Sequence, residues 1–249
     1  MPGRLVYPLL AALLYLVMAP TVASAKTPPV RVLFVGNSHT TTHDLPLVVA
    51  TLARERGIEI ETVMLAGPGL SLGDHLARGE LQRALREEWH WVVLQQGPSS
   101  LPESRTDLIR SAKLVANELN GRAVRIALMS TWPHRRYRAS SLAAEDSYRL
   151  AAEAIGACVM PAATAWRHAL GDGQAPRLYQ RDQLHATRAG TVLAALSILP
   201  RLVGEDQSGL RTLPGKAPSG MSDELRVLRA AAWRAHQDEP LRCTTGVER

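Results

Sequence analysis

The chain has 249 residues and a net charge of +6, and only 4% of its residues are aromatic. This length is enough for one domain with a sizeable buried core, which must be rich in Leu, Val and Ala because the chain has a single Phe. The arginines are scattered, apart from one dense basic cluster at residues 134–138. No nucleic-acid-binding motif surrounds that cluster, so we expect no nucleic-acid partner. We interpret it as a solvated loop, with the alternative that it borders a site for an anionic substrate.

The first 25 residues have the pattern of a cleaved export signal. Arg4 precedes an apolar run from Leu5 to Met18, and the segment ends in Ala23-Ser24-Ala25. The run is shorter than the roughly 20 residues that a membrane-spanning helix needs, and no later stretch is long enough. No cysteine follows the run where a lipid anchor would attach. We therefore predict a signal peptide at residues 1–25 and a secreted or periplasmic protein without stable membrane insertion; an uncleaved single-span anchor is the weaker alternative.

Strands alternate with helices from the first apolar run after this signal. Val30 to Val35 is apolar apart from Arg31, and such a run is typical of a strand buried on both faces of a parallel sheet. Asp44 begins a predicted helix that Gly57 ends. The second strand, the next helix and the third strand are predicted at Ile58 to Leu65, residues 74–88 and Trp91 to Gln95.

The same alternation continues to residue 203. Further helices are predicted at residues 104–120, 142–155, 162–170 and 187–203, and further strands at Val124 to Met129 and Cys158 to Met160. This pattern predicts an α/β fold, a three-layer α/β/α sandwich around a five-stranded parallel sheet. We assign residues 26–203 to this domain. Residues 204–249 are predicted to form a linker, a helix at about residues 223–236 that docks on the domain, and a tail.

The chain has two cysteines, Cys158 and Cys243. In an oxidising compartment they can form a disulfide that ties the tail to the domain. The alternative is that Cys158 is a small buried apolar residue and that Cys243 lies in a frayed end. Both alternatives remain open at this stage.

Three segments far apart in the sequence carry the groups that acyl transfer needs. Gly36-Asn37-Ser38 follows the first strand, a glycine loop spans Gly67 to Gly69, and Asp182 and His185 precede a helix. The active sites of open parallel sheets form beyond the carboxyl ends of the strands, where Ser38 lies. The Asp-His spacing lets the carboxylate accept from Nδ1 and leaves Nε2 to take a proton. Each segment alone is also compatible with an ordinary turn or helix cap.

Together these segments resemble the SGNH (GDSL-like) hydrolase family. Its first block ends in Gly-Asp-Ser or Gly-Asn-Ser, and its last block is Asp-x-x-His. The matching residues are Phe34 to His39 and Asp182 to Thr187, and the resemblance spans roughly residues 30–203. It implies the flavodoxin-like strand order 2-1-3-4-5 and an esterase that needs no cofactor and no metal.

The resemblance also implies roles for individual residues. Ser38 would be the nucleophile, His185 the general base and Asp182 the carboxylate that orients His185. The donors to the oxyanion would be the backbone N–H groups of Ser38 and Gly69, with Gly67 as the alternative to Gly69. The expected substrate is a small-molecule or glycan ester, such as a glycan O-acetyl ester or a short acyl or lipid ester.

The third block departs from the family pattern. The family strand ends in Gly-x-Asn-Asp, whereas this chain has Gly97-Pro98-Ser99-Ser100. With the Asn absent, a third donor must come from the Ser99 hydroxyl or from the amide of Gln96 or Gln95. Loss of one such donor lowers the rate about 10²- to 10³-fold in a known case. The alternative function is therefore a non-catalytic or weakly active glycan-binding module.

A second serine also matches a hydrolase motif. Residues 69–73 fit the Gly-x-Ser-x-Gly elbow of α/β-hydrolases, with Ser71 as the nucleophile. That elbow follows directly on a strand, whereas Gly69 lies four residues beyond Leu65, so we favour Ser38.

Several aromatic residues are further candidates. His39 and His43 lack the Glu of a metal-binding helix, so we predict no metal and expect His39 to line the pocket. Trp132, Tyr137 and Trp166 either contact a sugar or acyl chain or pack in the core.

Overall fold

The computed structural model describes residues 28–98, 100–204 and 222–239. The predicted signal peptide, Ser99, most of the predicted linker and Cys243 lie outside the described residues. Cys158 is disulfide-bonded. None of the helices within the described ranges is long and apolar enough to cross a membrane.

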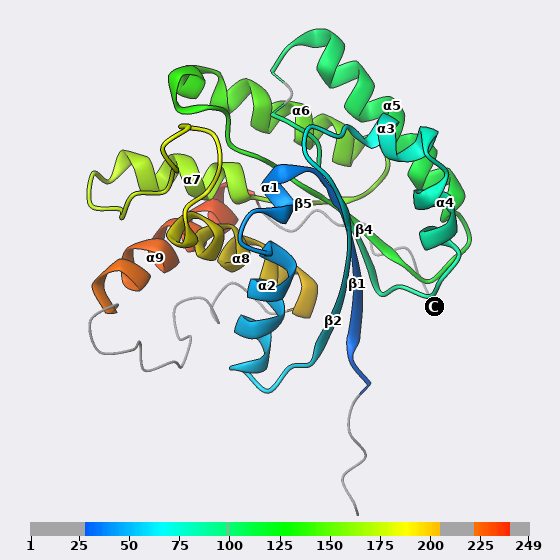
Figure 1. The fold of residues 1–249 in the computed structure, drawn as a ribbon, viewed down its shortest axis with the longest axis horizontal. Helices are drawn as coiled ribbons and strands as arrows, with labels where there is room; N and C mark the ends of the chain where they lie inside the picture. The colour runs from blue at the N-terminus through cyan, green and yellow to red at the C-terminus, as the bar shows by residue number, and fades with distance from the viewer. Residues whose placement is uncertain (1–27, 99, 205–221, 240–249) are drawn as a thin grey trace, which may run out of the picture.

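Five parallel strands form one sheet in the order β2-β1-β3-β4-β5, which confirms the predicted fold class and strand order (Figure 1). The strands are β1 (Val30–Gly36), β2 (Ile60–Ala66), β3 (Trp91–Leu94), β4 (Arg125–Met129) and β5 (Cys158–Met160). β1 lies at the point where the strand order reverses, between β2 and β3. The segment that follows β1 therefore begins at the switch point of the sheet, where open α/β folds place their ligands.

Both faces of the sheet are buried, because helices cover each of them (Figure 1). Alternate residues of β1 belong to different cores: Val32 and Phe34 to one, Leu33 and Val35 to the other. The first core includes residues of α2 (Leu45–Arg54), α7 (Ala162–Gly171), α8 (Arg188–Val203) and α9 (Ser222–Asp238). The second includes residues of α3 (Leu72–Ala77), α4 (Glu80–Leu85), α5 (Pro102–Glu118) and α6 (Ser141–Glu153).

Three elements differ from the predictions. The single helix predicted at residues 74–88 is two helices, α3 and α4, because Gly79 has a φ of 73° and breaks the helical path between them. Two short helical segments lie where the sequence predicted no helix: α1 (Ser38–Thr41) and the 3₁₀ helix η1 (Arg135–Ser140). Both segments follow the carboxyl ends of strands, so both bear on the candidate site.

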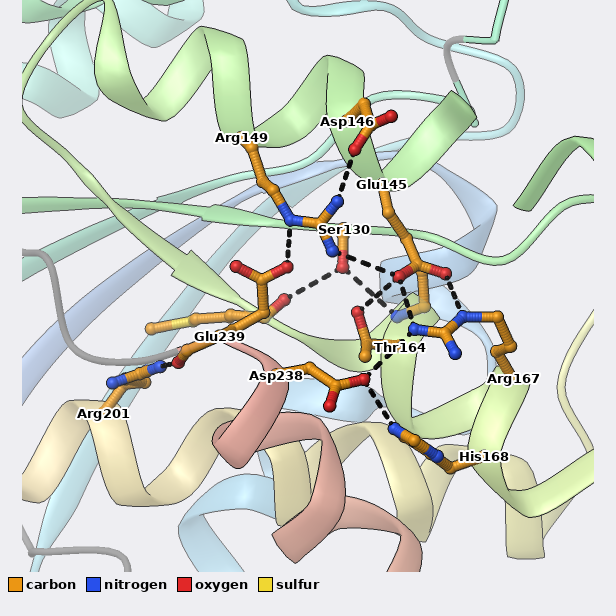
Figure 2. Close-up of polar contacts among 12 residues, drawn as sticks. Ser130, Glu145, Asp146, Arg149, Thr164, Arg167, His168, Arg201, Asp238 and Glu239 are labelled. Atoms are coloured by element: carbon orange, nitrogen blue, oxygen red, sulfur yellow. Dashed lines mark hydrogen bonds and ion pairs between the residues drawn. The ribbon is translucent and has the colours of Figure 1, made fainter. Parts of the chain in front are cut away.

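The C-terminal helix α9 docks on the domain, where the sequence predicted a helix. Its apolar face joins the first core through Leu228, Ala231, Ala232 and Ala235, all buried. A polar network on α6, α7 and α9 continues this contact (Figure 2). Arg149 pairs with Glu239, and Asp238 accepts hydrogen bonds from Arg167 (3.3 Å) and His168 (2.8 Å). Helix α9 is thus part of the folded unit.

Candidate active site

Ser38 is the first residue of α1, directly beyond the carboxyl end of β1. Asn37 caps this short helix, and its side-chain oxygen accepts from the N–H of His39 at 3.1 Å. The Ser38 carbonyl accepts from the backbone N–H (3.0 Å) and the hydroxyl (2.6 Å) of Thr42. The half-buried Ser38 side chain makes no hydrogen bond to any described residue. Its hydroxyl therefore remains open to a base or a substrate.

The turn that carries Ser38 is held by the buried amide of Gln95, at the end of the neighbouring strand β3. Gln95 Oε1 accepts from the Asn37 N–H and the Thr40 hydroxyl, both at 2.8 Å. Its Nε2 donates to Asn37 Oδ1 at 2.9 Å and to the carbonyl of Gln96 at 2.6 Å. Every donor and acceptor of this amide is used. Gln95 therefore positions the turn, a role that the sequence interpretation, which considered it as an oxyanion donor, missed.

Gly36 makes this close approach of two strands and a helix possible. A Cβ atom at position 36 would lie 2.4 Å from Gln95 Oε1 and 2.4 Å from Thr40 Oγ1. Real Cβ contacts are never so short, so the hydrogen bonds that Gln95 makes to Asn37 and Thr40 depend on a glycine here.

Asp182 and His185 form a direct pair in the loop before α8. His185 Nδ1 lies 2.6 Å from Asp182 Oδ2, and Asp182 Oδ1 accepts from the N–H groups of Leu184 and His185, both at 3.0 Å. These hydrogen bonds, first that of the His185 ring, lower the pKa of Asp182 to about 2. The carboxylate is thus ionised at neutral pH and accepts the Nδ1 proton. This tautomer leaves Nε2 of His185 as the basic nitrogen.

His39 joins the serine turn to the loop of His185. Its buried ring lies with its centroid 6.3 Å from that of His185 and 5.1 Å from that of Trp132. Trp132 in turn donates from Nε1 to the carbonyl of Leu184 at 3.0 Å. The structure therefore brings Ser38, whose neighbour is His39, to the same end of the sheet as Asp182 and His185. Ser38 and His185 make no direct hydrogen bond to each other.

Burial also sets the charge of His39. Loss of solvent, and secondarily the proximity of His185, lower the pKa of His39 to about 4. Its Nδ1 lies 3.2 Å from Asn37 Oδ1. His39 is therefore neutral at physiological pH and places no positive charge beside His185.

Two tryptophans considered as substrate contacts are core residues. Trp132 and Trp166 are each 1% exposed and stack with centroids 3.6 Å apart. A Cβ atom on Gly190 would lie 2.4 Å from the ring of Trp166, so the start of α8 packs directly on this stack. Tyr137, in contrast, is 58% exposed on η1.

The glycine loop after β2 lies beside the serine turn. Asn37 Nδ2 donates to the carbonyl of Leu70 at 3.3 Å, and the N–H of Gly67 donates to the carbonyl of Gly36 at 3.3 Å. Gly69 has a φ of 70°, and its N–H makes no hydrogen bond to a described residue. The N–H of Gly67 is thus occupied, whereas that of Gly69 is open to a ligand.

Comparisons with known proteins show which fold the chain shares. No protein-family model matches the chain, and no curated protein matches it either. It is similar to the solved structure of a candidate SGNH hydrolase from Slackia heliotrinireducens, with 28% sequence identity, a TM-score of 0.58, and 69% of this chain and 98% of that chain covered. The chain has the SGNH hydrolase fold. This confirms the resemblance inferred from the sequence blocks.

Two further solved structures share the SGNH fold of the chain. A DUF4886 family protein from Bacteroides uniformis is 19% identical, with a TM-score of 0.67 over 87% of this chain and 99% of that chain. The lipase/acylhydrolase from Enterococcus faecalis is 17% identical, with a TM-score of 0.58 over 70% of this chain and 95% of that chain.

The third block of this SGNH fold carries the residues expected as further oxyanion donors. Gln96 is buried; its Oε1 accepts from the N–H of Leu72 at 3.1 Å, and its Nε2 lies 3.4 Å from Asp107 Oδ2. Asp107 engages one of the two Nε2 hydrogens, and the second makes no hydrogen bond to a described residue. Ser99, the other candidate, lies outside the described residues.

Ser71, the alternative nucleophile, is a helix cap in this SGNH fold. Its hydroxyl accepts from the N–H of Asp74 at 3.1 Å and donates to Asp74 Oδ2 at 2.7 Å. The backbone N–H of Ser71 donates to the same carboxylate oxygen at 2.8 Å, which completes a capping box at the start of α3. No histidine accepts from this hydroxyl. Within the described ranges, no group of three or more His, Cys, Asp or Glu residues is arranged to hold a metal ion.

Proposed function

We propose that the chain hydrolyses carboxylic esters with Ser38 as nucleophile, His185 as general base and Asp182 as the orienting carboxylate. The observation that carries this proposal is the 2.6 Å contact between Asp182 and His185, made in a loop that packs against His39, the residue after Ser38. A carboxylate, an imidazole and an open hydroxyl then lie at the switch point of the sheet, which is the arrangement that acyl transfer requires.

In the first half-reaction, Ser38 Oγ attacks the ester carbonyl carbon while His185 Nε2 takes the hydroxyl proton. The tetrahedral intermediate collapses, the bond to the alcohol oxygen breaks, and His185 returns the proton to the departing alcohol. Water then attacks the acyl-serine with the same base, which releases the acid and restores Ser38. The absence of a Ser38–His185 hydrogen bond is compatible with this role, because catalytic hydrogen bonds often tighten only when substrate binds.

The backbone N–H groups of Ser38 and Gly69 are the proposed donors to the oxyanion. Neither makes a hydrogen bond to a described residue, and the Asn37–Leu70 hydrogen bond holds their two loops together. Backbone donors aimed at the developing negative charge are fixed before the reaction and cost no reorganisation. A third donor from Gln96 or Ser99 stays a prediction.

The proposed setting is outside the cytoplasm. The export signal predicted at residues 1–25 and the disulfide bond of Cys158 support it, because disulfides persist in oxidising compartments. The proposed substrates are glycan O-acetyl esters or short acyl or lipid esters. The names of two similar structures, a candidate SGNH hydrolase and a lipase/acylhydrolase, are in keeping with ester hydrolysis.

Labelling and turnover of the purified chain test the proposal. We expect hydrolysis of 4-nitrophenyl acetate and covalent labelling by a fluorophosphonate, both abolished by Ser38→Ala. Ser71→Ala is the matched control, because it removes a hydroxyl that the structure assigns to a helix cap. Labelling that persists in Ser38→Ala and disappears in Ser71→Ala would overturn the assignment of the nucleophile.

The second candidate function is a glycan-binding module with weak turnover or none. The third block favours it, because this chain has Ser99 where the family has an oxyanion-donating Asn. A wild-type chain that binds acetylated glycans but neither reacts with a fluorophosphonate nor hydrolyses esters would support this candidate and exclude the esterase.

A further inference from the structure

Four exposed arginines border the proposed catalytic pair without a carboxylate partner. We call them the arginine rim; they are Arg135, Arg136 and Arg138 on η1 and Arg181 in the loop of Asp182. Arg135 Nη1 donates to the neutral Gln183 side chain at 3.3 Å, and the guanidinium of Arg136 lies 5.2 Å from the centroid of the Tyr137 ring. The side chains of Arg138 and Arg181 contact no acid among the described residues.

Hydrogen bonds fix the arginine rim relative to His185. The backbone N–H of Arg135 donates to the carbonyl of Gln183 at 2.8 Å, two residues before His185. The Tyr179 hydroxyl donates to the carbonyl of Pro133 at 2.9 Å, and the N–H of Gln180 donates to the carbonyl of His185 at 2.8 Å. The two loops therefore form one hydrogen-bonded unit, so adjoining segments carry the rim arginines and His185.

The two loops that carry the arginine rim and His185 have mostly positive charge. Residues 130–141 contain no acid, and Asp182, the only acid in residues 173–204, is engaged by His185. Some other exposed arginines do have carboxylate partners, as in the pairs Arg110–Asp107 and Arg226–Asp223. A cluster of one sign raises the local concentration of oppositely charged molecules, and a guanidinium binds carboxylate, phosphate or sulfate through paired hydrogen bonds.

We propose that the site selects esters that carry an anionic oxygen group, such as a carboxylate, close to the scissile bond, and that the arginine rim holds this group. The inference rests on the proposed esterase function and adds the charge class of its substrate. Ser38, His185 and Asp182 perform the same hydrolysis on charged and uncharged esters, so the rim acts on substrate capture rather than on the chemical step.

Two pairs of probes, each matched in size, test this selectivity in the purified chain. The first pair, mono-4-nitrophenyl succinate and 4-nitrophenyl butyrate, places the charge on the acyl side. The second pair, 4-acetoxybenzoate and its methyl ester, places the charge on the alcohol side. We expect kcat/KM to favour the anionic member of at least one pair by about tenfold at low ionic strength. This preference should fall when about 0.5 M NaCl shortens the range of the charges.

The triple variant Arg136→Gln, Arg138→Gln, Arg181→Gln should reduce this ratio of kcat/KM values to near one. The double variant Arg83→Gln, Arg86→Gln is the control and should keep the wild-type ratio. Arg83 lies in α4 and Arg86 at its C-cap, on the other side of the sheet, and both are exposed and close in sequence to Glu80, Glu87 and Glu88. Loss of the ratio in the control as well would overturn the assignment to the rim.

The remaining outcomes separate the two proposals. A wild-type chain that hydrolyses the neutral esters but shows no preference in either pair overturns the charge selectivity alone. A chain that hydrolyses none of the four esters and resists the fluorophosphonate overturns the esterase and this inference together. Rim-dependent binding of a single-stranded oligonucleotide without any ester preference would identify a nucleic-acid surface, which also overturns the inference.

Discussion

The rings of His39 and His185 lie with their centroids 6.3 Å apart, although the two residues come from opposite ends of the domain's sequence. His39 is buried between this partner and Trp132, and burial keeps it neutral. A neutral ring at this place restricts the orientation of His185 without competing as a base. We therefore expect His39 to act as a positioning residue that connects the serine turn to the proposed base.

Replacement of His39 tests this positioning role. In His39→Ala the His185 ring loses a packing partner, and we expect kcat for 4-nitrophenyl acetate to fall about 10- to 100-fold with little change in KM, because small displacements of a catalytic group are costly. His39→Phe keeps a ring and should retain most of the activity. Steady-state kinetics of both variants check the prediction, and a His39→Ala variant with wild-type kcat would contradict it.

Gly36 should tolerate no side chain. Gly36→Ala forces a Cβ atom against Gln95 Oε1 and Thr40 Oγ1, which are hydrogen-bonded to each other. We expect a loss of about 1 to 3 kcal/mol in the free energy of unfolding, together with a loss of turnover. The control is Gly171→Ala at the end of α7, where a Cβ atom would meet nothing within 4 Å. Urea denaturation of both variants measures the difference; equal stabilities would show that the turn relaxes.

The alternation of strands and helices was predictable because its signals are local. The buried apolar run of β1, the cap at Asp44 and the glycine stop at Gly57 are each visible in a few consecutive residues. The break between α3 and α4 was missed, because an isolated glycine such as Gly79 is compatible with a helix until tertiary packing selects a positive φ.

The candidate site was predictable only in part. The Asp182–His185 pair follows from a spacing within one turn, whereas the burial of His39 and Trp132 depends on how distant segments pack. Gln95 stands at the end of a strand next to β1, and that position was the one sequence signal that its amide would meet the serine turn. Its four hydrogen bonds became visible only in three dimensions.

Glu145 is expected to stabilise the packing of α6 against α7. Its buried carboxylate accepts from Arg167 Nε (2.9 Å) and from the Thr164 hydroxyl (2.8 Å) (Figure 2). Glu145→Gln removes the buried partner charge of Arg167, which keeps only its contact with Asp238, and we expect a loss of about 2 kcal/mol in unfolding free energy. Asp223→Asn breaks the exposed pair with Arg226 and should cost about 0.5 kcal/mol or less. Chemical denaturation distinguishes the two, and equal losses would refute a structural role for the buried network.

Stability should fall with acidification between pH 6.5 and about 4. Burial, and then the charge of Arg201, lower the pKa of His236 to about 3 from an ordinary 6.5. The unfolded chain therefore binds a proton in this range while the folded chain does not, so the stabilisation is complete above pH 6.5 and declines as the pH falls towards 3. His236→Leu should flatten this slope, whereas His43→Gln, at an exposed ring, should not. Urea denaturation at a series of pH values gives the slopes; an unchanged slope in His236→Leu would show that His236 is protonated in the folded chain.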